Sequence, residues 1–144
     1  EFRRVLFRSK INKYNTELFK KALPELRNST VEVYIDAENP KKFQEIAEVL
    51  KQAGSKKVKR LMAVILKNEY HEQIYKREED DITAIKLMAG KSGNQNYRIY
   101  CREFFKEGKK VVLITPHIKK VQRNQQDQTI VNIIQILKTY DYEF

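Results

Sequence analysis

Apolar residues recur every three or four positions between residues 40 and 66, and this period predicts two amphipathic helices. Asn39 and Pro40 suit the start of the first helix, and Gly54 suits its end. Ser55 is a candidate cap for the second helix, which we expect to run towards Glu69. The short loop predicts a helical hairpin with one apolar stripe on each helix. The stripes are Phe43, Ile46, Ala47 and Leu50 in the first helix and Val58, Leu61, Met62, Ile65 and Leu66 in the second.

Four other stretches carry the two-residue alternation or the β-branched and aromatic content that is typical of strands. One half-buried strand is predicted over residues 30–36, before the helices. Three more are predicted over 81–89, 96–105 and 109–118, and their short glycine-containing connections favour antiparallel neighbours. The charged stretch 76–81 is interpreted as a break between the second helix and these strands.

The end of the chain returns to a helical period, with Ile130, Ile133, Ile134 and Leu137 on one face and Asp127 as a possible cap. The order is therefore strand, helix, helix, three strands, helix. It predicts an α+β domain in which a helical hairpin and a C-terminal helix pack on one face of a small antiparallel sheet.

The first 29 residues are less regular, and we expect the domain proper to span 30–144. Residues 1–9, EFRRVLFRS, match one translated frame of a common sequencing adapter, so we interpret them as a scar that packs poorly. Residues 10–29 form an N-terminal extension with a short helical pattern from Thr16 that Pro24 interrupts. Whether this extension is a docking helix or upstream context stays open.

Composition narrows the class of protein. The length of 144 residues fits one domain, and the longest aliphatic run, Leu61–Leu66, is far too short to span a bilayer. The single cysteine, Cys101, cannot form an internal disulfide, and with only two histidines it makes no metal-ligand set. We therefore expect a cytoplasmic protein without a metal, a small-molecule cofactor or a membrane partner.

The charge favours a polyanionic partner. Residues 1–9 hold three of the 29 basic and one of the 19 acidic residues, so the rest of the chain has a net charge of +8. Lysines and arginines that neutralise phosphates release counterions, which makes nucleic acid the first expectation. A merely basic surface is the alternative.

The predicted strand 96–105 concentrates the candidate chemistry. Side chains two residues apart share a face, so Arg98, Tyr100 and Arg102 lie together. The guanidinium groups can bind phosphates and the ring can stack on a base. The alternative is an ordinary solvent face in which the two arginines cover Tyr100. Tyr97 and Cys101 face the other way, and Cys101 is expected in the core.

Neighbouring strands can add further groups to this face. Lys86 lies in the preceding strand, and His117, Lys119 and Lys120 end the following one, so a compact sheet can bring them near Arg98. A histidine titrates in the right range to transfer a proton at neutral pH, although a lone histidine is more often structural. The other histidine, His71, is expected at the surface.

The order of elements, together with three short motifs, resembles the RelE/ParE toxin superfamily, and most closely its HigB-like, phage-derived branch. The resemblance covers about residues 30–143. Its motifs are Tyr97-Arg98-Ile99, the aliphatic strand Val111–Ile114, and Lys119-Lys120-Val121-Gln122 before the last helix.

The resemblance implies the toxin of a type II toxin-antitoxin pair, an endoribonuclease that needs no metal and cleaves mRNA in the ribosomal A site, so inhibiting translation. It implies an antitoxin protein, mRNA and the ribosome as partners. Arg98 would stabilise the phosphate, with Lys86 as a second cation and His117 or Lys119 as the proton-transfer or leaving-group residue. Relatives often carry an aromatic residue before Val-Lys-Lys where this chain has His117 and Ile118, so the motif does not assign the general base. The residues expected to contact RNA are Tyr97, Tyr100, Arg102, Lys120 and Arg123.

Two other functions remain open from the sequence. A gyrase-directed ParE-type toxin would share the fold without cleaving RNA. A non-catalytic basic RNA-binding module would share the charge but not the chemistry.

Overall fold

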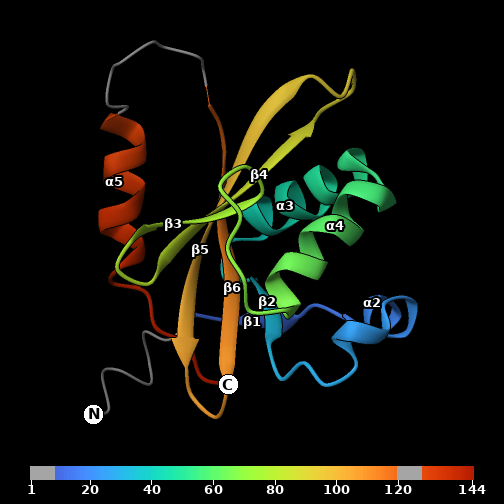
Figure 1. Cartoon of the computed structure of the whole chain (residues 1–144). Helices are drawn as coiled ribbons and strands as arrows, with labels where there is room; N and C mark the ends of the chain where they lie inside the picture. Colours follow the sequence, from blue (N-terminus) through green and yellow to red (C-terminus); the bar gives the residue numbers. More distant parts are fainter. Residues whose placement is uncertain (1–8, 120–127) are drawn as a thin grey trace.

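A computed structural model describes residues 9–119 and 128–144, which form a six-stranded sheet with helices on both faces (Figure 1). The α+β class that the sequence predicts is confirmed. No helix among these residues has the length and apolar character needed to cross a membrane. In chain order the elements are β1 (Ile11–Lys13), α2 (Glu17–Ala22), the 3₁₀ helix η1 (Pro24–Leu26), β2 (Glu32–Asp36), α3 (Pro40–Ala53), α4 (Ser55–Leu66), β3 (Tyr75–Glu79), β4 (Ile82–Ala89), β5 (Gln95–Phe105), β6 (Lys109–Ile118) and α5 (Gln128–Leu137).

The sheet is mixed, so the expectation of a purely antiparallel sheet is wrong. The strand order is β1-β2-β6-β5-β4-β3. The four consecutive strands β3 to β6 pair antiparallel with their chain neighbours, as predicted. However, β2 runs parallel to β6, with Val33 opposite Val111. Parallel neighbours need a long crossover connection, and here the helical hairpin and three strands lie between them in the chain.

The helices cover both faces of the sheet, so the expectation that all of them lie on one face is also wrong. In Figure 1, α3 and α4 lie on one side of the sheet and α5 on the other. The reason is visible in β6, whose run Val111–Ile114 is fully buried. Val111 and Leu113 join the core beneath α3 and α4, whereas Val112 and Ile114 join a second core beneath α5. A strand that is apolar on both faces needs cover on both.

The helical hairpin forms as its caps predict, with two corrections. The Asn39 side chain accepts hydrogen bonds from the backbone N–H groups of Lys41 and Lys42, at 3.1 and 3.2 Å. Gly54, with φ 93°, separates the helices and occupies the N-cap of α4, so Ser55 is already inside the helix and does not cap it. The second helix stops at Leu66 and does not reach Glu69.

Two short edge strands were not predicted. The charged stretch that was interpreted as a break overlaps β3, whose first residue, Tyr75, is buried while its other residues are charged. Charged residues are usual on edge strands, because they discourage pairing with other chains, but they hide the strand in a hydrophobicity pattern. At the opposite edge, β1 pairs with β2.

Residues 10–29 pack against the rest of the fold. The predicted short helix is present as α2 and ends before Pro24. Leu26 is completely buried, and Tyr14, Phe19 and Leu23 contact the core beneath α3 and α4. Residues 1–8 lie outside the described residues. Ser9, the last residue of the presumed scar, pairs with Tyr142 in an isolated bridge.

Candidate functional site

Lys86, Arg98 and His117 form a single row across three adjacent strands. Lys86 of β4 lies directly opposite Arg98 of β5, and Arg98 lies directly opposite His117 of β6. Side chains that are directly opposite in antiparallel strands share a face, with Cβ atoms about 5 Å apart. The expected proximity of these three residues is therefore confirmed, and we call them the cross-strand row.

The position of His117 depends on a β-bulge. Tyr100 is opposite Thr115 while the next residue, Cys101, is opposite Leu113, so Ile114 is an extra residue in β6. Without it, His117 would be opposite Tyr97 and would face α3 and α4. A one-residue change of register moves every following side chain to the other face. The bulge thus moves His117 onto the face of Arg98.

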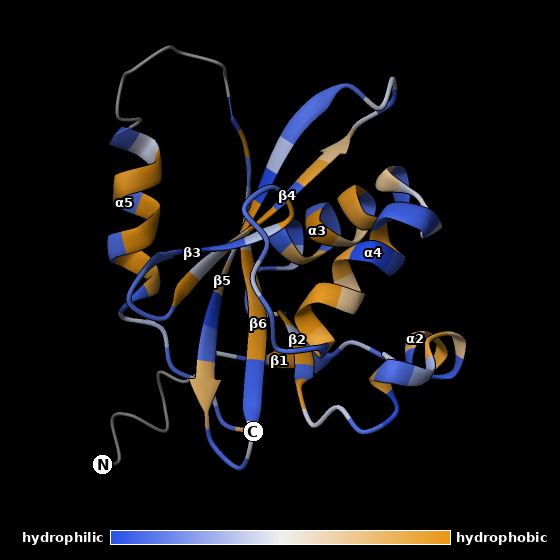
Figure 2. Cartoon of the chain, in the orientation of Figure 1, coloured by the Kyte–Doolittle hydropathy of each residue, from blue (hydrophilic) through white to orange (hydrophobic). Residues whose placement is uncertain are grey.

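The cross-strand row lies where the apolar core beneath α5 ends. Ala84 and Tyr100 are opposite each other and belong to that core. The next pair on the same face is Lys86 and Arg98, both partly buried. Figure 2 shows the change along β5, which is hydrophilic towards its N-terminal end. The row therefore forms the polar continuation of an apolar surface.

Two cations, Lys86 and Arg98, face each other in the row. Partial burial lowers the pKa of Lys86, and the nearby charges of Lys76 and Arg98 lower it further, although the carboxylates of Glu72 and Glu78 act in the opposite direction. Its Nζ donates to the backbone oxygen of Glu72 at 2.7 Å. Partial burial also lowers the pKa of Arg98, whose guanidinium donates to Asn96 Oδ1.

Within residues 9–119 and 128–144, neither Lys86 nor Arg98 forms an ion pair. Like charges directly opposite each other destabilise a sheet. A bound anion would relieve this repulsion, so the row is suited to a phosphate.

The row also holds an imidazole, that of His117, and extends by one further pair. His117 is partly buried, and its Nε2 is shielded from solvent. The exposed Lys119 donates its backbone N–H to the oxygen of Asn96 at 2.9 Å, which continues the register of β6 with β5. All four residues predicted to take part in chemistry are therefore on one face of the sheet. Asn96 was not among the predicted residues, although it lies two residues before Arg98 on the same strand and could have been found from that spacing.

The residues predicted to contact RNA are more scattered. Tyr97 is on the opposite face and 9% exposed. Tyr100 is 2% exposed in the core beneath α5, so its ring is not available as an open stacking surface. Lys120 and Arg123 lie outside the described residues. The predicted surface of two arginines around an accessible tyrosine does not form, because α5 covers this part of the sheet.

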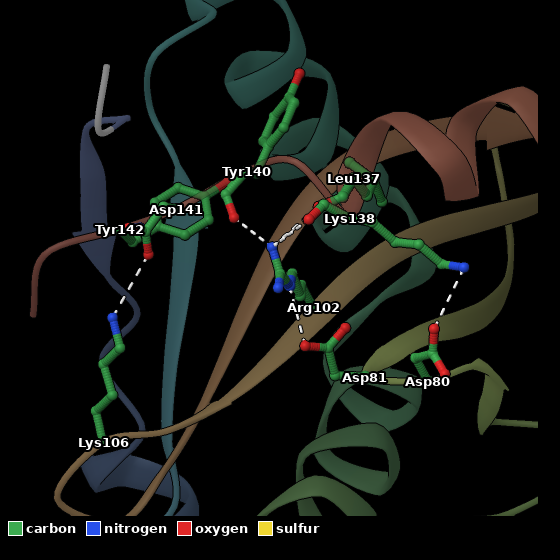
Figure 3. Close-up of polar contacts among 9 residues, drawn as sticks. All are labelled: Asp80, Asp81, Arg102, Lys106, Leu137, Lys138, Tyr140, Asp141 and Tyr142. Atoms are coloured by element: carbon green, nitrogen blue, oxygen red, sulfur yellow. Dashed lines mark hydrogen bonds and ion pairs between the residues drawn. The ribbon is translucent and has the colours of Figure 1, made fainter. Parts of the chain in front are cut away.

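Arg102 holds the end of α5 in place (Figure 3). Its Nε donates to Asp81 Oδ2 at 3.1 Å. One terminal nitrogen donates to the backbone oxygens of Leu137 and Lys138, at 3.4 and 3.0 Å, and to that of Tyr140. The last carbonyl groups of a helix lack partners within it, and a cation satisfies them well. We call this arrangement the Arg102 clamp.

Two other predictions, the burial of Cys101 and the exposure of His71, agree with the structure. Cys101 is buried, which raises the pKa of its thiol, as expected of a core cysteine. His71 is exposed, and its Nδ1 accepts from the backbone N–H of Gln73 at 3.1 Å. In the part of the chain that the structure describes, no three or more His, Cys, Asp or Glu side chains gather in a way that could hold a metal ion.

Comparisons of the chain with models of protein families, with curated proteins and with solved structures find no match.

Proposed function

We propose that this protein is the toxin of a type II toxin-antitoxin pair and cleaves mRNA on the ribosome, with the cross-strand row as its site. The observation that carries the proposal is the alignment of Lys86, Arg98 and His117 on one face of the sheet. Two adjacent cations next to an imidazole are groups that can stabilise the phosphate and transfer a proton during phosphodiester cleavage.

The proposed chemistry uses the 2′-hydroxyl of the RNA as the nucleophile. Its oxygen forms a bond to the adjacent phosphorus, and the bond from phosphorus to the 5′-oxygen breaks, which leaves a 2′,3′-cyclic phosphate. Negative charge grows on the phosphoryl oxygens during this step, and Arg98 and Lys86 stabilise it. His117 or Lys119 transfers a proton to or from the reacting oxygens.

The order of the elements supports the resemblance on which the biological role rests. From β2 onward the chain has a strand, two helices, four consecutive strands that pair antiparallel with their chain neighbours, and a final helix. Only the edge strand β3 is added to the predicted order within this region. An antitoxin protein, mRNA and the ribosome are the proposed partners, and the cytoplasm is the proposed site of action.

The test is a purified translation system in which ribosomes carry a defined mRNA. Wild-type protein should cleave the mRNA, and Arg98→Ala and His117→Ala should leave it intact. Arg27→Ala is the matched control, because Arg27 is an exposed arginine outside β4, β5 and β6. If wild-type protein stops neither translation nor growth, the proposal is wrong.

The alternatives are distinguished by the same translation experiment together with a DNA supercoiling assay and an RNA-binding assay. Intact mRNA together with inhibition of DNA supercoiling by gyrase would favour a ParE-type toxin. Binding to RNA without cleavage, and without dependence on His117, would favour a non-catalytic module.

A further inference from the structure

The outer face of α4 carries a cluster of cations that the cross-strand row does not use. Lys56, Lys59 and Arg60 are all exposed, and they lie on the side opposite the buried stripe of the helix. Residues three and four apart on a helix have Cβ atoms about 5–6 Å apart, so the three charges lie within about one turn. We call them the α4 cationic surface; Figure 2 shows the N-terminal half of α4 as hydrophilic.

This cluster breaks the usual rules for helix charges. The first turn of a helix favours acidic residues, because the helix dipole is positive there. The segment Ser55–Leu66 has four basic residues in its first half and contains no acidic residue. The neighbouring helix α3 differs, since Glu45 and Glu48 are interspersed with its lysines. Positions where a sequence departs from such a local preference, with no contact that offsets the cost in stability, are often functional.

The surrounding structure does not neutralise the cluster. In the part of the chain that the structure describes, Lys56, Lys59 and Arg60 form no ion pair. The adjacent Lys57 donates to the backbone oxygen of Met88 at 3.1 Å, which is not a charge partner. Lys67, just beyond the helix, lies 3.7 Å from Glu25. The positive charge of the cluster is therefore available to a partner.

The chemistry of the surface favours a phosphate backbone over a protein. Protein interfaces are depleted in lysine and are anchored by aromatic or aliphatic side chains. None of the large hydrophobic side chains that lie exposed in the described part of the chain belongs to α4. Binding of single strands normally uses exposed aromatic rings on which bases stack, and this helix offers none. The partner that still fits this surface is a double-stranded nucleic acid, whose phosphate backbone lysine and arginine can contact without base stacking.

We propose that the α4 cationic surface binds the phosphate backbone of double-helical RNA without reading its sequence. That the partner is RNA rather than DNA rests on the proposed function. Because α4 and the cross-strand row are on opposite faces of the sheet, the duplex is a different segment from the one that is cleaved. In a ribosome-dependent nuclease, the duplex would be a helix of ribosomal RNA that holds the enzyme on the ribosome.

The test measures binding rather than cleavage, so it is independent of the proposed reaction. Equilibrium binding of a fluorescent RNA duplex is followed over a range of salt concentrations for wild type and for Lys56→Ala/Lys59→Ala/Arg60→Ala. The control is Lys41→Ala/Lys42→Ala/Lys51→Ala, which removes the same charge from α3. Alanine is the most favourable residue for a helix, and the three positions are exposed, so the α4 variant should stay folded. Circular dichroism checks this.

We expect the α4 variant to bind the duplex about tenfold or more weakly at physiological salt, and the control to change much less. The slope of log affinity against log salt concentration should become shallower by about 2.7, since each of the three lost phosphate contacts contributes about 0.9 to it. Unchanged affinity and salt dependence would overturn the proposal. So would equal competition by poly-L-glutamate, which would identify an acidic protein as the partner, or tighter binding of a DNA duplex of the same length.

If the mRNA is never cleaved but duplex binding depends on α4, only the proposed function fails. If Arg98 is needed for cleavage but the α4 variant binds duplex normally, only this inference fails.

Discussion

Arg98 and Arg102 lie four residues apart on the same strand and the same face, yet their surroundings differ. Arg102 is held by Asp81 and by three backbone carbonyls at the end of α5 (Figure 3). Arg98 has one amide partner, Asn96, and faces the cation of Lys86. The guanidinium of Arg102 holds parts of the fold together, and that of Arg98 is the one that we propose to bind the phosphate.

The role of each arginine depends on what covers it. The two-residue spacing of β5 makes Arg98 and Arg102 equivalent in the sequence. The core beneath α5 includes Tyr100 and Phe104, which lie on either side of Arg102, and it ends between Tyr100 and Arg98. The covered arginine is therefore structural, and the arginine beyond the edge of that core is available for chemistry.

The largest expected effect is the loss of cleavage in Arg98→Ala. Removing a cation that stabilises a developing oxyanion typically lowers the rate by about 100- to 1,000-fold. Folding stability should change by less than about 1 kcal/mol, because Arg98 forms a single side-chain hydrogen bond. Cleavage rates on programmed ribosomes check the predicted loss of activity, and urea unfolding checks the predicted small change in stability. A large loss of stability would make Arg98 structural and remove the contrast.

The next effect is on stability, in Arg102→Ala. This change leaves Asp81 and the carbonyls of Leu137, Lys138 and Tyr140 without their donor, and we expect unfolding free energy to fall by about 2–3 kcal/mol. Urea unfolding followed by circular dichroism measures it. Arg102→Lys should recover only part of the loss, since lysine lacks the guanidinium fork that reaches several acceptors. A stability equal to wild type would show that the clamp contributes little.

A smaller effect is expected at Asn96, which we regard as a positioning residue for Arg98. Asn96→Ala should lower cleavage by about tenfold, the scale of one hydrogen bond to a charged group. Asn96→Asp should lower it further, because the new carboxylate competes with the phosphate for Arg98. Urea unfolding should show Asn96→Asp to be at least as stable as wild type. Full activity of Asn96→Asp would mean that Arg98 does not bind the phosphate.

The smallest effect concerns stability at acid pH. It depends on the carboxylate of Glu32, which lies outside the cross-strand row. The cations of Lys110 and Lys13 hydrogen-bond to Glu32 and lower the pKa of its carboxyl to about 2. Because this pKa is lower in the folded state, the stabilisation is complete above about pH 4.5 and is lost as the pH falls towards 2.

The Glu32 carboxylate is partly exposed, so solvent screening should keep the effect below about 1 kcal/mol. Urea midpoints between pH 5 and pH 2 should fall less steeply for Glu32→Gln than for wild type. Parallel curves for the two proteins would show that the ion pairs of Glu32 add no stability.

Much of the fold could be predicted from the sequence because its long elements have strong periods. The stripes of α3 and α4 and the strands β4, β5 and β6 were found where the hydrophobic pattern placed them. The parallel pairing of β2 with β6 could not be found, since pairing depends on contacts between distant segments. The edge strand β3 was missed because its residues are charged rather than alternating.

The candidate site was predictable only in part, for a similar reason. Residue type pointed to Lys86, Arg98 and His117, and the register places them in one row. Strict alternation along β6 would have put His117 on the opposite face, because the extra residue Ile114 is not evident from the pattern. The burial of Tyr100 was not foreseen either, because it depends on which face α5 covers.

The most direct test of the account is the chemistry of the RNA ends that the protein produces on programmed ribosomes. If the cross-strand row cleaves RNA through the 2′-hydroxyl, the upstream fragment from wild-type protein carries a 2′,3′-cyclic phosphate or its hydrolysis product. Arg98→Ala, folded as shown by urea unfolding, yields no such fragment. Intact mRNA with wild-type protein, or equal cleavage by Arg98→Ala, would contradict the central claim.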